Sequence, residues 1–221
     1  MSTLRNPALH RLHRQNLLDA LAEGEGVLLF ASPHRVRSND TEYRYRPDSD
    51  LWYLSGWEQP EAAILLRKGA EQPFVMFVQP RNPERETWEG RRPGPEGAVA
   101  DFGADAAWPW TELSTRLPDL LMGMRALHYP VAQDPDMDAL VMGAIRGGRR
   151  KARKHGLDMP DTLIDPARLI HELRIIKSEA ELDLLRKAAE ITCEAHSRAM
   201  AMTAPGVFEY QLEAAIDGHF R

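Results

Sequence analysis

Three short runs of uninterrupted apolar residues constrain this chain more than any other feature of its sequence. The runs are Gly26–Ala31, Ala62–Leu66 and Phe74–Val78. A strand with one face in solvent alternates apolar and polar residues, whereas a strand covered on both faces is apolar throughout. The runs therefore predict the strands of a sheet that lies between two layers of other elements.

The spacing of the runs predicts how some of the strands pair. The segment Arg67–Gln72 between the second and third runs is short enough for a hairpin, which makes those two strands antiparallel. An antiparallel pair among strands buried on both faces predicts a mixed sheet. Leu51–Leu54 and Ala126–Tyr129 are predicted to be further strands.

Helices are predicted between these strands. Asn6–Pro7 and Asp134–Pro135 each combine an N-cap residue with a proline at the first helical position, and apolar residues follow at helical spacing. A helix over 113–121 is expected to kink or end at Pro118. Helices that alternate with strands predict an α/β domain, a mixed sheet flanked by helices, which closes near 160–165.

Residues 79–97 interrupt this alternation. They contain four prolines and three glycines, which prevent a helix or a strand from running far. We therefore predict a long loop here, with Trp88 among charged residues. A long loop inside a compact domain is functional or disordered, and a tryptophan is poorly suited to a disordered segment.

Beyond the α/β domain only helices are predicted. Ser178 and Glu181 form a capping box that starts a long amphipathic helix, and a second helix begins near Phe208. The apolar pattern of the second helix is still running at Arg221. We expect residues 1–173 to form an N-terminal α/β domain and residues 174–221 to be the first two helices of a truncated, all-helical second domain.

Composition restricts the classes of partner. The single cysteine, Cys193, fits a reducing compartment, and no run of 18 apolar residues occurs, so we expect a cytoplasmic protein without membrane contact. The net charge of −5 gives no general attraction to nucleic acid. The basic stretch Arg149–His155 carries no aromatic residue that would stack on bases. A solvated helix end is favoured over a nucleic-acid site, and a positive rim beside a substrate channel is a third interpretation.

No residue pattern predicts a catalytic centre. His171 starts a sequence like the zinc-protease helix motif, but Ile175 occupies the position of the second histidine. His10 and His13 have no third ligand nearby and are expected to face solvent. Cys193, with a histidine three residues on, is expected to be a small buried side chain. We expect neither a metal site nor a catalytic residue in this chain.

Several segments together resemble one protein family. Asn39–Trp57 and Glu86–Arg92 are similar to the N-terminal domain of bacterial Xaa-Pro aminopeptidases (aminopeptidase P). His171–Ser178 resembles the junction with the pita-bread catalytic domain, and Glu190–Met200 and Pro205–Tyr210 resemble the first two helices of that domain. The resemblance covers nearly the whole chain in the right order. It implies a creatinase/prolidase N-terminal-like fold.

The resemblance implies a metal-dependent exopeptidase that removes an N-terminal residue preceding proline. Such enzymes hold two divalent metals, usually manganese, with ligands that all lie downstream of the segment matched here. The complete enzyme would act on proline-containing peptides and form a homo-oligomer, whereas this chain alone would be inactive. A free-standing, non-catalytic assembly or binding domain, or part of a prolidase-type dipeptidase, is the alternative.

The resemblance also implies a set of residues at the rim of the substrate site. In the family a tryptophan matching Trp88 reaches from one subunit into the mouth of its neighbour's active site. Asp40, Arg153 and Lys154 are similar to further members of that rim. The competing hypothesis for Trp88 is that it packs locally and pins its own loop.

Overall fold

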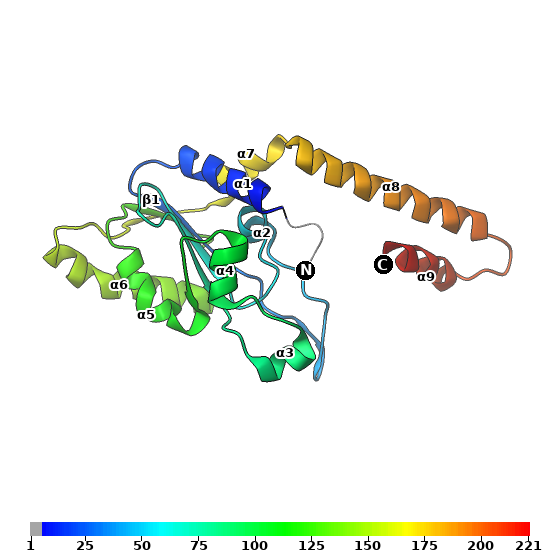
Figure 1. Ribbon diagram of the computed structural model, residues 1–221, viewed down its shortest axis with the longest axis horizontal. Coiled ribbons are helices and arrows are strands. Elements are labelled where there is room, and N and C mark those ends of the chain that lie inside the picture. The colour runs from blue at the N-terminus through cyan, green and yellow to red at the C-terminus, as the bar shows by residue number, and fades with distance from the viewer. Residues whose placement is uncertain (1–5) are drawn as a thin grey trace. The chain divides into compact units, whose positions relative to one another are not determined.

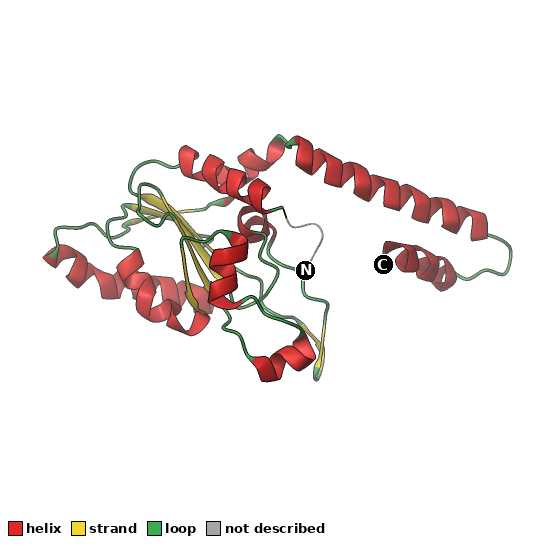
Figure 2. Ribbon diagram, in the orientation of Figure 1, coloured by secondary structure: helices red, strands yellow, loops and turns green. Residues whose placement is uncertain are grey.

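The computed structural model describes residues 6–221 (Figure 1), and the chain divides into two compact units, residues 1–173 and residues 174–221. The first unit contains a sheet flanked by helices, and the second contains helices (Figure 2). Each unit is described by itself below. None of the described helices is long and apolar enough to cross a membrane.

A mixed sheet is the centre of the first unit. Within the described residues it has six strands in the order β6-β5-β4-β1-β7-β8. β1 is antiparallel to β4, and β4 to β5, while the remaining neighbours are parallel. The predicted mixed sheet and the predicted hairpin are thereby confirmed. The strands are β1 (Glu25–Phe30), β4 (Ala63–Arg67), β5 (Phe74–Val78), β6 (Ala106–Pro109), β7 (Ala126–His128) and β8 (Thr162–Ile164).

Each face of the sheet is covered by its own layer of helices, as the continuous apolar runs predict. Alternate strand residues enter two separate cores, so that Val27 faces one layer and Leu28 the other. The first core is closed by α1 (Pro7–Ala20), α2 (Ser49–Ser55), α4 (Gly94–Phe102) and α7 (Ala167–Ile175), and the second by α5 (Leu113–Leu120) and α6 (Pro135–Lys154). In Figure 1, α1 lies on one side of the strands and α5 and α6 on the other.

The predicted helix starts are found where the N-cap signals place them. The side chain of Asn6 accepts a hydrogen bond from the backbone N–H of Leu9, and Asp134 accepts two in the first turn of α6. Both helices have proline in the first turn, where the missing N–H has no helical partner to lose. Pro118 lies in the last turn of α5, which ends two residues later.

The prediction of a strand over Leu51–Leu54 is wrong, because these residues belong to α2. Asp48 Oδ1 accepts hydrogen bonds from the N–H groups of Asp50 and Leu51, and Gly56 ends the helix in the left-handed conformation with φ of 70°. A side chain that satisfies two free N–H groups and a glycine at the C-terminus define a helix of two turns. These caps outweigh the strand preference of the aromatic residues between them.

The prediction of a long loop over residues 79–97 is also wrong. α3 (Pro83–Glu89) and the start of α4 occupy this segment. Asn82 caps α3 and Pro83 follows it, which is the same signal that starts α1. Gly94 begins α4 with φ of 67°, and a Cβ there would lie 2.9 Å from Cγ of Arg81. The glycines and prolines mark the ends of short helices here.

Four strands have no counterpart among the predictions. β6 and β8 lie at the two edges of the main sheet and are only partly buried. β2 (Val36–Ser38) and β3 (Thr41–Glu42) form a separate, exposed two-stranded sheet with Asn39 at its turn in the left-handed region. β2, β3 and β8 lack a continuous apolar run, and β6 is a run of only four residues that ends in proline; all four depend on the neighbour to which they pair.

The second unit consists of α8 (Glu179–Met202) and α9 (Glu209–Phe220) within the described residues. The predicted capping box is present: Ser178 Oγ accepts from the N–H of Glu181, and the Glu181 carboxylate accepts from the N–H of Ser178. The buried residues of the two helices are the small Ala195 and Ala199, and their large apolar side chains are exposed or only partly buried.

Candidate functional site

Trp88 lies on α3 and is 89% exposed. Trp88 therefore does not pack against its own unit. The local-packing hypothesis required such packing, and the exposure of the side chain contradicts it. The helix that carries it has only two turns, capped by Asn82 and ended by Gly90. A large aromatic side chain in this position presents most of its apolar surface to solvent, which is unusual unless a partner covers it.

An ion pair fixes the start of the helix that carries Trp88. Nε and Nη2 of Arg81 donate to the two carboxylate oxygens of Glu86 at 3.1 and 3.0 Å. This hydrogen bond lowers the pKa of Glu86 and raises that of Arg81. A bidentate pair of this kind restricts the orientation of α3 more than a single contact would.

The other three predicted rim residues are exposed and lie on different elements. Asp40 is in the turn between β2 and β3, and Arg153 and Lys154 are in the last turn of α6. Figure 1 places α3 and the C-terminal end of α6 in different parts of the first unit. No hydrogen bond or ion pair joins any two of the four residues in the part of the chain that the structure describes. Within one chain, α3 with Trp88 is therefore separate from the end of α6 with Arg153 and Lys154, and the grouping of the four residues stays a prediction.

A stripe of positive charge runs along α6 and includes two of these residues. Its exposed members, at position 146 and in the pairs 149–150 and 153–154, recur every three or four positions and so lie on one side of the helix. None of them has an ion pair among the described residues, and the stripe is about 12 Å long at 1.5 Å per residue. The interpretations as a solvated face and as a substrate rim both remain predictions. The stripe consists of Arg146, Arg149, Arg150, Arg153 and Lys154.

The expectations for two histidines and the cysteine are wrong. His10 and His13 are 2% and 4% exposed, and Nδ1 of each lies within 3.0 Å of the carbonyl oxygen of Tyr53. The His13 ring also stacks on the Tyr53 ring with centroids 3.7 Å apart. Their spacing on α1 turns both toward α2, which the sequence could not show without the position of α2. Cys193 is exposed on α8.

The described residues do not fit a metal site. No group of three or more histidine, cysteine, aspartate or glutamate side chains among residues 6–221 is arranged to hold an ion. No catalytic step is therefore assigned to a metal within this chain.

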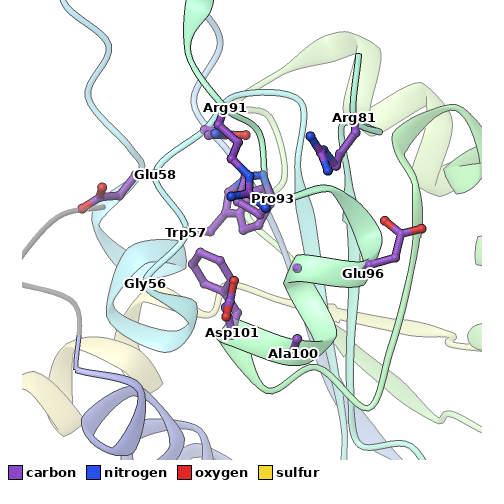
Figure 3. Close-up of a pocket in the computed structure, with 12 residues that line it drawn as sticks. Gly56, Trp57, Glu58, Arg81, Arg91, Pro93, Glu96, Ala100 and Asp101 are labelled. Carbon is purple, nitrogen blue, oxygen red and sulfur yellow. The ribbon is translucent and has the colours of Figure 1, made fainter. Parts of the chain in front are cut away.

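Sequence reasoning missed a pocket beside α4 (Figure 3). Its volume is about 830 Å³, and its walls come from residues 56–59 after α2, Arg81 before α3, the segment between α3 and α4, and α4 itself. Trp57 and Phe102 form an aromatic floor with ring centroids 4.8 Å apart. The glycines and prolines of residues 90–97, which let this segment turn twice, are the signal that marks the pocket wall in the sequence.

Residues 10–128 match the protein family described as "Aminopeptidase P, N-terminal domain". The chain belongs to the aminopeptidase P family. The match covers more than half of the chain and includes every strand of the main sheet except β8.

Curated relatives extend the match to nearly the whole chain. The Xaa-Pro aminopeptidase of Escherichia coli is 38% identical over 209 residues, which are 94% of this chain and 47% of that enzyme. The Xaa-Pro aminopeptidase of Haemophilus influenzae is 32% identical over 92% of this chain and 45% of that enzyme. The chain thus spans about half the length of the curated relatives it matches.

Solved structures of aminopeptidase P share the fold. The Pseudomonas aeruginosa aminopeptidase PepP is 37% identical with a TM-score of 0.93, over 98% of this chain and 49% of that one. Aminopeptidase P from E. coli has a TM-score of 0.91, and one of its structures is a zinc-substituted form in complex with product. The second unit is included in these matches, because the coverage extends to both units.

Proposed function

We propose that this chain is the N-terminal part of a metal-dependent Xaa-Pro aminopeptidase, which removes an N-terminal residue preceding proline. The observation that carries the proposal is the similarity of both units, in order, to one half of Xaa-Pro aminopeptidases. The first unit is then the N-terminal domain, residues 1–173. The second unit, residues 174–221, is the beginning of the catalytic domain. Similarity across both units favours this proposal over a free-standing assembly domain, which would need only the first.

The catalytic metal, manganese or another divalent ion, would be held by residues beyond those matched here. Support comes from the zinc-substituted E. coli relative and from the lack of a ligand cluster in residues 6–221. The chain alone is therefore expected to be inactive. A cytoplasmic location is supported by the single cysteine.

A chimera tests the proposed function. We expect the 221-residue chain to show no hydrolysis of an Xaa-Pro peptide with added manganese. Fused to the remaining C-terminal half of the E. coli enzyme, it should hydrolyse that peptide and lose activity with a chelator. A chimera that folds and loads metal but cleaves no Xaa-Pro peptide would contradict the proposal. Cleavage of free Xaa-Pro dipeptides only would favour the prolidase-type alternative.

The same chimera tests the rim. We propose that Trp88 of one subunit covers the substrate site of a neighbouring subunit in a homo-oligomer, with Asp40, Arg153 and Lys154 nearby. Its 89% exposure supports a partner surface. Trp88→Ala should lower kcat/KM roughly tenfold on peptides that extend past the proline, the effect of losing one buried aromatic contact. The metal content should not change.

A stability measurement separates this role from packing. Since Trp88 is exposed, Trp88→Ala should leave the free energy of unfolding within about 0.5 kcal/mol of the parent chain. Val131→Ala, at another exposed apolar position, is the matched control and should change neither quantity. Unchanged kinetics in the Trp88 variant would remove Trp88 from the substrate site.

A further inference from the structure

The pocket beside α4 holds two opposite charges that have no partner. Arg91 and Asp101 line it, and neither has an ion pair or a side-chain hydrogen bond with the described residues. In the view of Figure 3, the Arg91 side chain extends from above toward Trp57, and Asp101 is drawn below Trp57. Two unpaired charges of opposite sign that do not reach each other fit a ligand that carries both charges at its ends.

The remaining charged groups of the pocket are engaged or turned away. Arg81 is paired with Glu86, and Glu58 accepts a hydrogen bond of 3.4 Å from Nε1 of Trp52. The carboxylates of Glu58 and Glu96 point away from Trp57 in Figure 3. Arg91 and Asp101 are therefore the charges that a ligand over the aromatic floor would meet.

Two buried polar atoms of the pocket also lack partners. The indole Nε1 of Trp57 is a donor without an acceptor, and Oε1 of Gln59 is an acceptor without a donor among the described residues. Buried polar groups are nearly always hydrogen-bonded, so this pair indicates missing polar contacts. A peptide group offers one C=O and one N–H, which are the two kinds of atom required.

We propose that this pocket binds a short peptide with free termini. Its carboxylate contacts Arg91, its ammonium group contacts Asp101, and its body lies over Trp57 and Phe102. The volume of about 830 Å³ is in the range that holds a drug-sized ligand, which suits a dipeptide or tripeptide. A nucleotide fits less well, since Asp101 repels its phosphates. All residues that line the site belong to the first unit.

Titration of the full chain with a dipeptide, Ala-Phe, tests the proposal. In ¹H–¹⁵N spectra the indole signal of Trp57, identified among the five tryptophans by Trp57→Phe, should shift saturably. N-acetyl-Ala-Phe and Ala-Phe-amide each lose one charge and should bind roughly tenfold more weakly, as expected for a charged hydrogen bond. Blocked peptides that bind as tightly as Ala-Phe, or no saturable shift, would overturn the proposal.

Variants assign each terminus to its residue. Asp101→Asn should weaken Ala-Phe binding roughly tenfold, and N-acetylation should then cause no further loss. Arg91→Gln should likewise weaken Ala-Phe binding roughly tenfold, and amidation of the peptide should then cause no further loss. Asp158→Asn and Arg85→Gln, at exposed positions outside the pocket, should bind like the parent chain. The assignment would be contradicted if the control variants lost as much Ala-Phe affinity as the pocket variants. It would also be contradicted if substituting a residue and blocking its assigned terminus weakened binding by the sum of the two separate effects. The blocked peptides test the charge requirement on unaltered protein, whichever variants fold.

Discussion

Glu25 shows how one side chain joins distant strands. It is the first residue of β1, and its carboxylate lies 3.1 Å from Nε2 of His128 at the end of β7. It also accepts a hydrogen bond from the N–H of Ala22 and pairs with Arg125 at 3.4 Å. Burial alone would raise the pKa of Glu25, but the hydrogen bonds from His128 and Ala22 and the nearby positive charges outweigh it. The pKa is therefore lowered.

A lowered pKa predicts how stability depends on pH. The folded state favours the ionised form of Glu25. The stabilisation from Glu25 is therefore complete above its ordinary pKa of 4.5, and it is lost as the pH falls through the lowered pKa. Glu25→Gln should reduce the free energy of unfolding by about 1 kcal/mol near pH 7 and by much less near pH 3.5. Urea unfolding at both pH values measures the difference.

The exposed neighbour Glu23 provides the control. Glu23→Gln should change the free energy of unfolding by less than about 0.5 kcal/mol at either pH. If the difference in the free energy of unfolding between the Glu25 variant and the parent chain did not change with pH, the charge of the carboxylate would have no part in joining β1 to β7.

At the scale of elements, the strands that the sequence predicts correctly are those buried on both faces. β1, β4 and β5 are continuous apolar runs, and burial alone determines them. The edge strands β6 and β8 could not be predicted, because their pairing with β5 and β7 is set by tertiary contacts. Strands that are buried on both faces could be predicted from their apolar runs, whereas the partly buried edge strands could not.

The helix α2 shows a different limit. The sequence Leu51–Leu54 suits a strand by composition, and the deciding residues are the caps outside it. The candidate rim was predictable only in part for a similar reason. Trp88 was identified from its surroundings in the sequence, but its exposure depends on α3, whose cap at Asn82 was overlooked. The glycines and prolines of residues 90–97 mark one wall of the pocket beside α4, but the pocket also needs residues 56–59 and 81, which only the folded chain brings to that wall.

Removing the N-cap tests the account of α2. Asp48 Oδ1 accepts two backbone hydrogen bonds at 3.0 and 2.8 Å, so Asp48→Ala should lower the free energy of unfolding by about 1 kcal/mol. Asp48→Asn keeps an acceptor and should lose less than half of that. Thermal or urea unfolding measures both. Equal losses in the two variants would show that the charge of Asp48, and not its capping bond, stabilises α2.

At the scale of the whole molecule, the second unit has more apolar surface than its two helices can cover. The large exposed residues of α8, α9 and the segment between them are about half to two-thirds accessible to solvent. α9 also lines a shallow groove with Leu212, Ile216 and Phe220. Exposed apolar surfaces of this kind mark interaction sites on soluble proteins in general. On α8, α9 and the segment between them, the exposed residues are Leu185, Met200, Met202, Phe208, Tyr210 and Phe220.

We expect the 221-residue chain to associate with a second copy through this surface. Sedimentation velocity should show a mass that rises with concentration and changes little with salt, since apolar contacts are not screened. Leu185→Gln with Phe220→Gln should shift the chain toward monomer. The matched pair Val36→Gln with Val131→Gln, exposed apolar positions of the first unit, should not. A chain that stays monomeric at high concentration with ordered α8 and α9 would contradict the expectation.

The position of β1 in the sheet has a consequence for synthesis on the ribosome. β1 pairs with β4 on one side and with β7 on the other, where Gly26 lies opposite Leu127 in the register. Translation adds about 5–20 residues per second, so the β7 edge of an apolar strand stays open for roughly 5–20 s after β1 emerges. Closure of the first core also needs Ile170 of α7. During that interval the nascent chain exposes an unpaired apolar edge, the feature through which strands of separate chains join and which chaperones must cover.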